Sequence, residues 1–280
     1  MFARFSRSWA LIKASGEVLK QDKELMVFPL CSAVASILLV ASFIVPLVVT
    51  ESWQGIAEDD SILPWALMFL FYIVQYFIVF FFNAALVGAA MIRLDGGDPT
   101  VGDGLRIARG RVGAILGYAA IAATVGLILR MIEERAGFIG RWISGLLGVA
   151  FTVATFLTVP LLVSRDVGPI EAVKESAALL KRSWGENIIG NAGMGIVFTL
   201  LYFCVGTIGL LWIFAMTTTE NGPLIIGSIG VTVLALIALG LVHSALQGVY
   251  AAALYRYVAD GEKSRTFSDD LLQGAFKIKM

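Results

Sequence analysis

Long apolar runs alternate with short polar segments along the chain. Each run holds about 18 residues or more, enough for a helix to cross a hydrocarbon layer about 30 Å thick. The runs cover about 29–50, 63–92, 112–129, 142–164, 188–216 and 223–255. This pattern predicts an all-α membrane protein with six transmembrane helices, paired as three helical hairpins over about 29–92, 112–164 and 188–255.

The polar segments after the second, fourth and sixth runs share one pattern: an Arg, a turn with Asp and Gly, and a short basic amphipathic helix. It appears at 93–111, which contains TVGDGLRIARGR, again at 165–182, and again at 256–276. Residues 1–28 mix apolar and basic positions in the same way. Helices with one apolar and one basic face are typical of the membrane–water interface. We therefore predict interfacial helices that introduce the hairpins, produced either by internal repetition or by similar turn chemistry at unrelated helix ends.

The basic residues are distributed unevenly between the two predicted faces of the membrane. Of the 21 Lys and Arg residues, all but Arg130, Arg135 and Arg141 fall in 1–28, 93–111, 165–182 and the C-terminal residues 256–280. The positive-inside rule places those segments in the cytoplasm. Both termini are then cytoplasmic, which agrees with an even number of spans. We predict a multi-pass protein of the prokaryotic cytoplasmic (inner) membrane.

Composition supports the same class. Hydrophobic residues make up 58% of the chain and charged residues 15%, and the mean hydropathy is +0.85, which is far from a soluble domain. Residues 1–280 are predicted to form a single polytopic membrane domain, with 256–280 as a cytoplasmic tail. Because about 25 polar and amphipathic residues precede the first apolar run, no cleaved signal peptide is expected. The net charge of zero gives no support to nucleic-acid binding.

Polar side chains inside the apolar runs are candidates for function, because an unpaired polar group in hydrocarbon is costly. Gln75 and Asn83 are eight residues apart in the second run, and His243 and Gln247 are four apart in the sixth, so each pair is predicted to share a helix face. These residues either line a polar path or bond neighbouring helices. For His243 the structural role is favoured, because no charged residue accompanies it at mid-membrane depth.

The sequence lacks the residues and motifs on which common enzyme mechanisms depend. The chain has one His and two Cys, and it has no HExxH or GxSxG sequence. We expect no enzymatic activity, no cofactor and no metal site. Small residues indicate packing instead: Gly113 and Gly117 form a GxxxG pair, which predicts a close helix contact.

The strings SWALIKASGEVLKQDKELMVFPL, GDPTVGDGLRIARGR and VGPIEAVKESAALLKRSWGEN, together with the six runs, resemble a known group. The chain is similar to bacterial and archaeal six-span membrane proteins of unknown function, which resemble in style the membrane domain of some glycerophosphodiester phosphodiesterases. The resemblance implies the same six-span architecture. It implies no catalytic or binding residue, and the soluble phosphodiesterase barrel is absent from this sequence.

Two functional hypotheses follow. The first, favoured because the repeated basic helices are distinctive and intramembrane charge is missing, is a lipid-interacting scaffold or a module that docks a protein partner or a second copy. The second is a transporter or channel with a polar path lined by spans two and six. The residues expected to contact anionic headgroups of the cytoplasmic leaflet in the first hypothesis are Arg4, Arg7, Lys13, Lys20, Arg106, Arg109, Arg111, Lys181 and Arg182.

Overall fold

The computed structural model describes residues 2–49, 62–182, 184–219 and 221–260, and these residues form helices without any strand. The predicted helix over Phe267–Phe276 and the acidic segment 51–60 lie outside the described residues. The elements are α1 (Phe2–Gln21), η1 (Lys23–Met26), α2 (Val27–Val49), α4 (Leu63–Leu94), α5 (Val101–Gly110), α6 (Val112–Ala154), α7 (Thr158–Ser164), α8 (Pro169–Arg182), α9 (Trp184–Thr217), α10 (Gly222–Tyr255) and η2 (Arg256–Asp260).

In the described part of the chain, five stretches are long and apolar enough to cross a membrane, so the class of multi-pass membrane protein holds. They are Lys23–Pro46, Leu63–Leu94, Val112–Ser164, Met194–Thr217 and Gly222–Ala259. The third stretch combines the third and fourth apolar runs. The count of six crossings and their pairing as hairpins therefore stay predictions.

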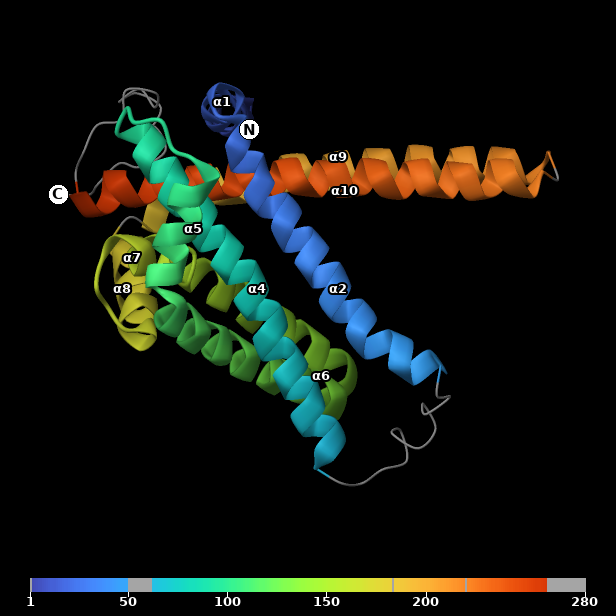
Figure 1. The fold of residues 1–280 in the computed structure, drawn as a ribbon, viewed down its shortest axis with the longest axis horizontal. Helices are drawn as coiled ribbons and strands as arrows, with labels where there is room; N and C mark the ends of the chain where they lie inside the picture. Colours follow the sequence, from blue (N-terminus) through green and yellow to red (C-terminus); the bar gives the residue numbers. More distant parts are fainter. Residues whose placement is uncertain (1, 50–61, 183, 220, 261–280) are drawn as a thin grey trace.

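The chain turns sharply inside α6, at Gly137. Its φ of 57° and ψ of −130° are not helical, and glycine adopts a positive φ without the steric cost that a side chain adds. After the bend, Gly140 packs so closely that a Cβ atom there would lie 2.6 Å from the Ile132 carbonyl oxygen. Farther along, a Cβ at Gly148 would lie 3.6 Å from Leu129. The two halves of α6 thus lie against each other, and Figure 1 shows the helix doubling back.

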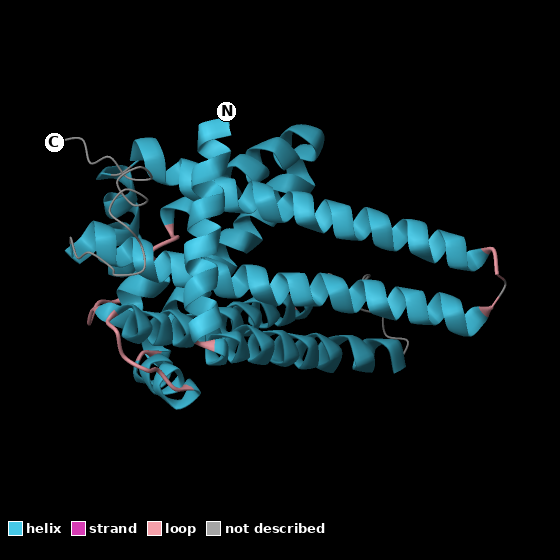
Figure 2. Cartoon of the chain, turned by 90° about the horizontal axis from the view of Figure 1, so that it is seen from above, coloured by secondary structure: helices cyan, strands magenta, loops and turns pink. Residues whose placement is uncertain are grey.

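The long helices extend from a set of shorter elements, and in Figure 1 α9 and α10 run at a wide angle to α2 and α4. These shorter elements are α1, η1, α5, α8 and η2, which we call the platform; Figure 2 shows α1 running across the long helices. The ends of the long helices away from the platform, which we call the loop end, include the bend of α6 and the turn between α9 and α10; Figure 1 shows these two points well apart. The platform thus collects the helices that the sequence predicted to be interfacial.

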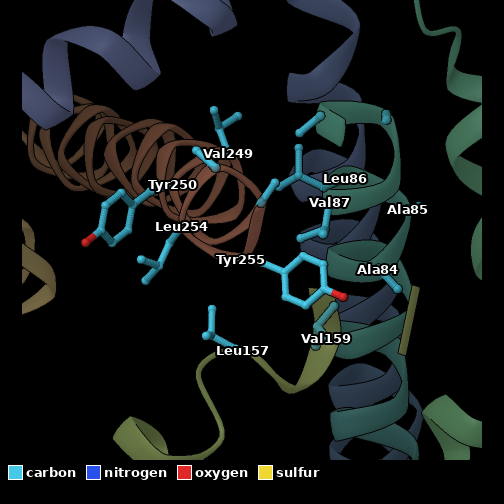
Figure 3. Packing of buried hydrophobic residues seen from close by; sticks show 14 of the residues in the cluster. Ala84, Ala85, Leu86, Val87, Leu157, Val159, Val249, Tyr250, Leu254 and Tyr255 are labelled. Atoms are coloured by element: carbon cyan, nitrogen blue, oxygen red, sulfur yellow. The ribbon is translucent and has the colours of Figure 1, made fainter. Parts of the chain in front are cut away.

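The buried core lies next to the platform. It centres on 84–90 of α4 and 245–255 of α10, which pack with α7, with Val18 of α1 and with Phe28 of α2. Figure 3 shows Leu86 and Val87 of α4 facing Val249 and Tyr255 of α10. Toward the loop end, large apolar side chains are exposed; Phe214, for example, is 71% exposed. Such a surface suits hydrocarbon better than water.

Ion pairs join the platform ends of the long helices. Arg93, near the end of α4, contacts Asp22 before η1 at 3.0 Å and Asp98 at 2.8 Å. Arg256, just after α10, pairs with Asp95, just after α4. These contacts hold α1, α4 and α10 together at one end.

A capping box caps the N-terminus of α5. The Thr100 side chain accepts a hydrogen bond from the Asp103 backbone N–H, and the Asp103 carboxylate accepts one from the Thr100 N–H at 3.0 Å. The helix then packs its small residues Gly104 and Ala108 inward. A Cβ at Gly104 would lie 2.6 Å from the Ala85 carbonyl oxygen of α4. The segment predicted as a purely interfacial helix is therefore also a packed part of the core.

Candidate binding site

A cavity of about 240 Å³ lies between α2, α4, α6 and α10. Its wall combines aromatic and aliphatic side chains with amides and hydroxyls, and none of its lining residues carries a charge. The polar lining residues are Ser32 of α2, Asn83 of α4, Tyr118 and Thr152 of α6, Thr155 between α6 and α7, and Ser244 and Gln247 of α10. We call this space the inner cavity.

A glycine on α10 brings two of these polar groups together. At Gly248 a Cβ atom would overlap the Leu86 side chain of α4 and would lie 3.4 Å from the Asn83 side-chain oxygen. The missing side chain lets α10 approach α4 closely at this point. Gln247 and Ser244 precede Gly248 by one and four residues, so this approach sets them beside Asn83 on the cavity wall.

The threonines of the wall are already bonded to their own helix. The Thr152 hydroxyl donates to the Gly148 carbonyl at 2.9 Å, and the Thr155 hydroxyl donates to the Phe151 carbonyl at 2.8 Å. Because its proton is used, the Thr152 oxygen offers acceptor lone pairs to the cavity, while the Thr155 side chain also lies in hydrogen-bond contact with the Tyr118 side chain. The amide groups of Asn83 and Gln247 add both donors and acceptors. The wall therefore has the chemistry to bind a neutral, hydrogen-bonding molecule.

A break in the helix after α6 shapes this wall. Helical geometry stops at Ala154 and resumes at Thr158, two residues before Pro160. Ser176 of α8 satisfies the freed backbone, since its hydroxyl donates to the Ala154 carbonyl at 2.7 Å and accepts from the Leu157 N–H at 3.1 Å. Bonding of this kind is what allows irregular backbone at membrane depth.

The structure brings together only two of the four intramembrane residues that the sequence singled out. Asn83 and Gln247 both line the inner cavity. Gln75 instead donates to the Ser36 hydroxyl of α2 at 2.9 Å, and the His243 ring stacks on Phe198 of α9 with centroids 4.2 Å apart and planes 9° apart. Gln75 and His243 therefore connect neighbouring helices.

The prediction that Gln75 and Asn83 share a helix face is wrong for a geometric reason. Eight residues at about 100° each leave the two side chains about 80° apart around the helix. Gln75 therefore meets α2, while Asn83 meets the cavity beside α10. Tyr118, Thr152 and Thr155 were not expected in the site; the one signal was the repeated Thr spacing in the fourth apolar run.

The basic residues expected to contact lipid have different environments. Lys13, Lys20, Arg109 and Lys181 are exposed on the platform. Two others pair with carboxylates: Arg106 with Asp103, and Arg111 with Asp166. The side chains of Arg4, Arg7 and Arg182 lie outside the described part of the chain.

Among the described residues, no three His, Cys, Asp or Glu side chains come together in a cluster that could hold a metal ion. The two cysteines, Cys31 and Cys204, are unpaired thiols on α2 and α9.

Comparison with protein families gives a match over most of the chain. No curated protein matches the chain, and the likeness to the membrane domain of glycerophosphodiester phosphodiesterases finds no support in the comparisons. Residues 62–265, well over half of the chain, match a family of unknown function. The chain therefore belongs to the family of unknown function DUF6159.

Proposed function

We propose that this protein binds a small uncharged polar solute inside the membrane and lets it cross, as a transporter or channel. The observation that carries the proposal is the inner cavity, where Asn83 and Gln247 meet hydroxyl groups among apolar walls. A charged solute in this setting would need a countercharge, which the lining residues do not provide. A neutral solute with hydrogen-bonding groups needs only the amides and hydroxyls.

We also propose six crossings, with α6 passing through the membrane twice around Gly137. As one straight helix, the 43 residues of α6 would be about 65 Å long, roughly twice the hydrocarbon thickness. The bend resolves this mismatch, and the packing of Gly140 on Ile132 supports a tight reversal. The basic platform then lies on the cytoplasmic leaflet of a prokaryotic inner membrane, with both termini inside.

Anchoring to anionic lipid is a second proposed role of the platform. Lys13, Lys20, Arg109 and Lys181 support it, because their side chains are exposed and each base near an anionic surface contributes about 1 kcal/mol. Pairing of Arg106 and Arg111 with carboxylates weakens this attraction. We therefore place solute binding ahead of a scaffold function.

Hydration of the inner cavity is the first property to test. The protein, with Cys31 and Cys204 replaced by Ser, is reconstituted in liposomes with either Ser244→Cys or Leu234→Cys. Both positions lie on α10 about equally far from its midpoint, but Ser244 lines the cavity and Leu234 is an exposed apolar position. N-ethylmaleimide reacts with thiolate, which needs water. We expect fast labelling at Ser244→Cys and little at Leu234→Cys; equal, slow labelling of both would refute the hydrated site.

Passage is the second property to test. Liposomes shrunk in hyperosmotic glycerol or urea reswell as the solute enters. Wild-type protein is expected to accelerate reswelling for at least one of these solutes, and Asn83→Leu is expected to abolish that gain. Equal rates for wild type, Asn83→Leu and protein-free liposomes would refute passage of solutes of this size.

A further inference from the structure

Two more cavities adjoin the inner one along α4 and α6. The middle cavity, of about 260 Å³, shares Phe80, Tyr118, Thr152 and Thr155 with the inner cavity. The outer cavity, of about 650 Å³, shares Gly126 and Leu129 with the middle one. Because neighbouring cavities have lining residues in common, the three lie next to one another in series.

The series runs toward the loop end. The outer cavity is lined by Arg130, Glu133 and Glu134 from the first half of α6 and by Ser144 and Gly145 from the second half. These residues flank the bend at Gly137. Charged groups therefore occur only in the outermost of the three cavities, where contact with water is expected, and the lining becomes uncharged inward.

A stacked aromatic pair separates the inner and middle cavities. The rings of Phe80 and Tyr118 have centroids 4.3 Å apart and planes 18° apart, and both residues line both spaces. The stack continues along α4 through Tyr76 and Tyr72, one helical turn apart each. At its outer end the Tyr72 hydroxyl accepts a hydrogen bond from Arg130 at 3.2 Å. The aromatic series thus follows the cavities from the charged mouth to the inner site.

The platform side of the inner cavity is closed by packed core. Leu86, which lines the cavity, and Tyr255 are at most 2% exposed, and Figure 3 shows both in the packed cluster between α4 and α10. Beyond them, Arg93 with Asp22 and Arg256 with Asp95 join the helix ends. Ser244 and Thr152 on the wall of the inner cavity are exposed, so the cavity also opens sideways, toward the hydrocarbon in the proposed arrangement, and the adjoining cavities of the series lie toward the loop end.

We propose that the solute enters the inner cavity from the loop end through the outer and middle cavities, and that the Phe80–Tyr118 pair is the gate on this route. The inference rests on the proposed function, since it describes access to the same site. Two substitutions should move access in opposite directions. Phe80→Ala removes half of the stack, whereas Gly126→Leu adds a side chain where a Cβ alone would lie 3.4 Å from the Tyr76 hydroxyl.

The experiment uses the cysteine-free protein with Ser244→Cys as the reporter of the inner cavity. A membrane-impermeant methanethiosulfonate reagent is added to sealed vesicles of each orientation. Thr219→Cys, near the turn between α9 and α10, marks the loop end, and Lys181→Cys marks the platform; both native side chains are exposed.

We expect Ser244→Cys to react only when the reagent is on the Thr219 side. Phe80→Ala should accelerate the reaction about tenfold or more, a ratio that corresponds to a barrier lower by about 1.4 kcal/mol, and Gly126→Leu should slow it. Phe77→Ala and Gly113→Leu are the matched controls. Phe77 pairs with Phe81 on the same helix and is absent from the cavity walls, and Gly113 faces open space.

The outcomes separate this inference from the proposed function. If Ser244→Cys reacts with permeant N-ethylmaleimide but with the impermeant reagent only from the Lys181 side, or from neither side even with Phe80→Ala, the cavity is hydrated and the route is overturned. Equal rates for Phe80→Ala and Phe77→Ala would overturn the gate. If N-ethylmaleimide itself fails to react, the proposed function falls as well.

Discussion

Gly104 on α5 provides a sharp test of how this helix is held. A Cβ atom there would lie 2.6 Å from the Ala85 carbonyl oxygen and 2.5 Å from the Phe28 ring, whereas Gly110 on the same helix has nothing within 4 Å. Gly104→Ala and Gly110→Ala are therefore the same chemical change in two environments. The first adds a methyl group against backbone that cannot rotate away, and the second adds it in open space.

The expected difference follows from two opposing effects. Overpacking a filled site costs about 1–3 kcal/mol, and the upper part of that range applies at Gly104 because a main-chain carbonyl is the obstacle. Replacing Gly by Ala in a helix gains about 0.5–1 kcal/mol. Gly104→Ala should therefore lose about 2 kcal/mol of unfolding free energy, while Gly110→Ala should keep or slightly raise it.

Unfolding in detergent micelles with a rising mole fraction of dodecyl sulfate, followed by Trp fluorescence, measures both variants against wild type. A clear loss for Gly104→Ala alone is the expected result. If the two variants unfold at the same mole fraction, α5 does not pack on α4 through Gly104, and the description of this segment as part of the core is wrong.

Two further predictions concern the platform. The Thr100 side chain and backbone donate hydrogen bonds to the Asp103 carboxylate, which hold its pKa below the ordinary value of 3.8. This stabilisation is present at neutral pH and is lost as the pH falls through the lowered pKa. Asp103→Asn should therefore be less stable than wild type at neutral pH, and the difference should close in acid, as followed by helix circular dichroism in micelles. Asp22 and Asp98 both bond Arg93, but their side chains are 6% and 93% exposed. In dodecyl sulfate titrations, Asp22→Asn should therefore lower the unfolding free energy by about 2 kcal/mol, and Asp98→Asn should lower it by less than about 1 kcal/mol. Equal losses would contradict the burial of the Asp22–Arg93 pair.

The sequence predicted the positions of the long elements well. The second apolar run was expected over 63–92 and the helix covers Leu63–Leu94, and the sixth was expected over 223–255 and the helix covers Gly222–Tyr255. Runs of this length have few alternatives, because every backbone group in hydrocarbon needs an internal partner. The polar segments after the second and fourth runs were equally clear, because turn residues and a helix start follow each of them, and α5 and α8 begin there at Val101 and Pro169.

Contacts between helices were not predictable in the same way. The GxxxG pair Gly113 and Gly117 was expected to mark a close helix contact, and only half of it does. A Cβ at Gly117 would lie 2.7 Å from Pro169 at the start of α8, whereas Gly113 faces open space. Other close approaches occur at Gly104, Gly209 and Gly248, none of which belongs to a GxxxG pair. Spacing of small residues shows where a close approach is permitted, while the neighbour that uses it depends on how the helices cross.

The same distinction decides which polar residues reach the cavity. Asn83 lines it and Gln75 does not, although both are amides on α4. A hydrophobic pattern identifies both as costly in hydrocarbon, and each must find a partner. Whether that partner is a neighbouring side chain or a solute depends on the helix opposite, which a single sequence does not record.

The position of the inner cavity follows from how α10 diverges from its neighbours. From Ala245 to Tyr255 this helix is almost entirely buried, but between Leu224 and Leu234 its large apolar side chains are exposed. The close approach at Gly248 lies in the buried part, and Gln247 and Ser244 lie where the burial ends. A space begins at this point because the helices separate there while α4 and the second half of α6 still supply walls. Packing at Gly248 and the size of the cavity are therefore linked, and a larger side chain at Gly248 would change both at once.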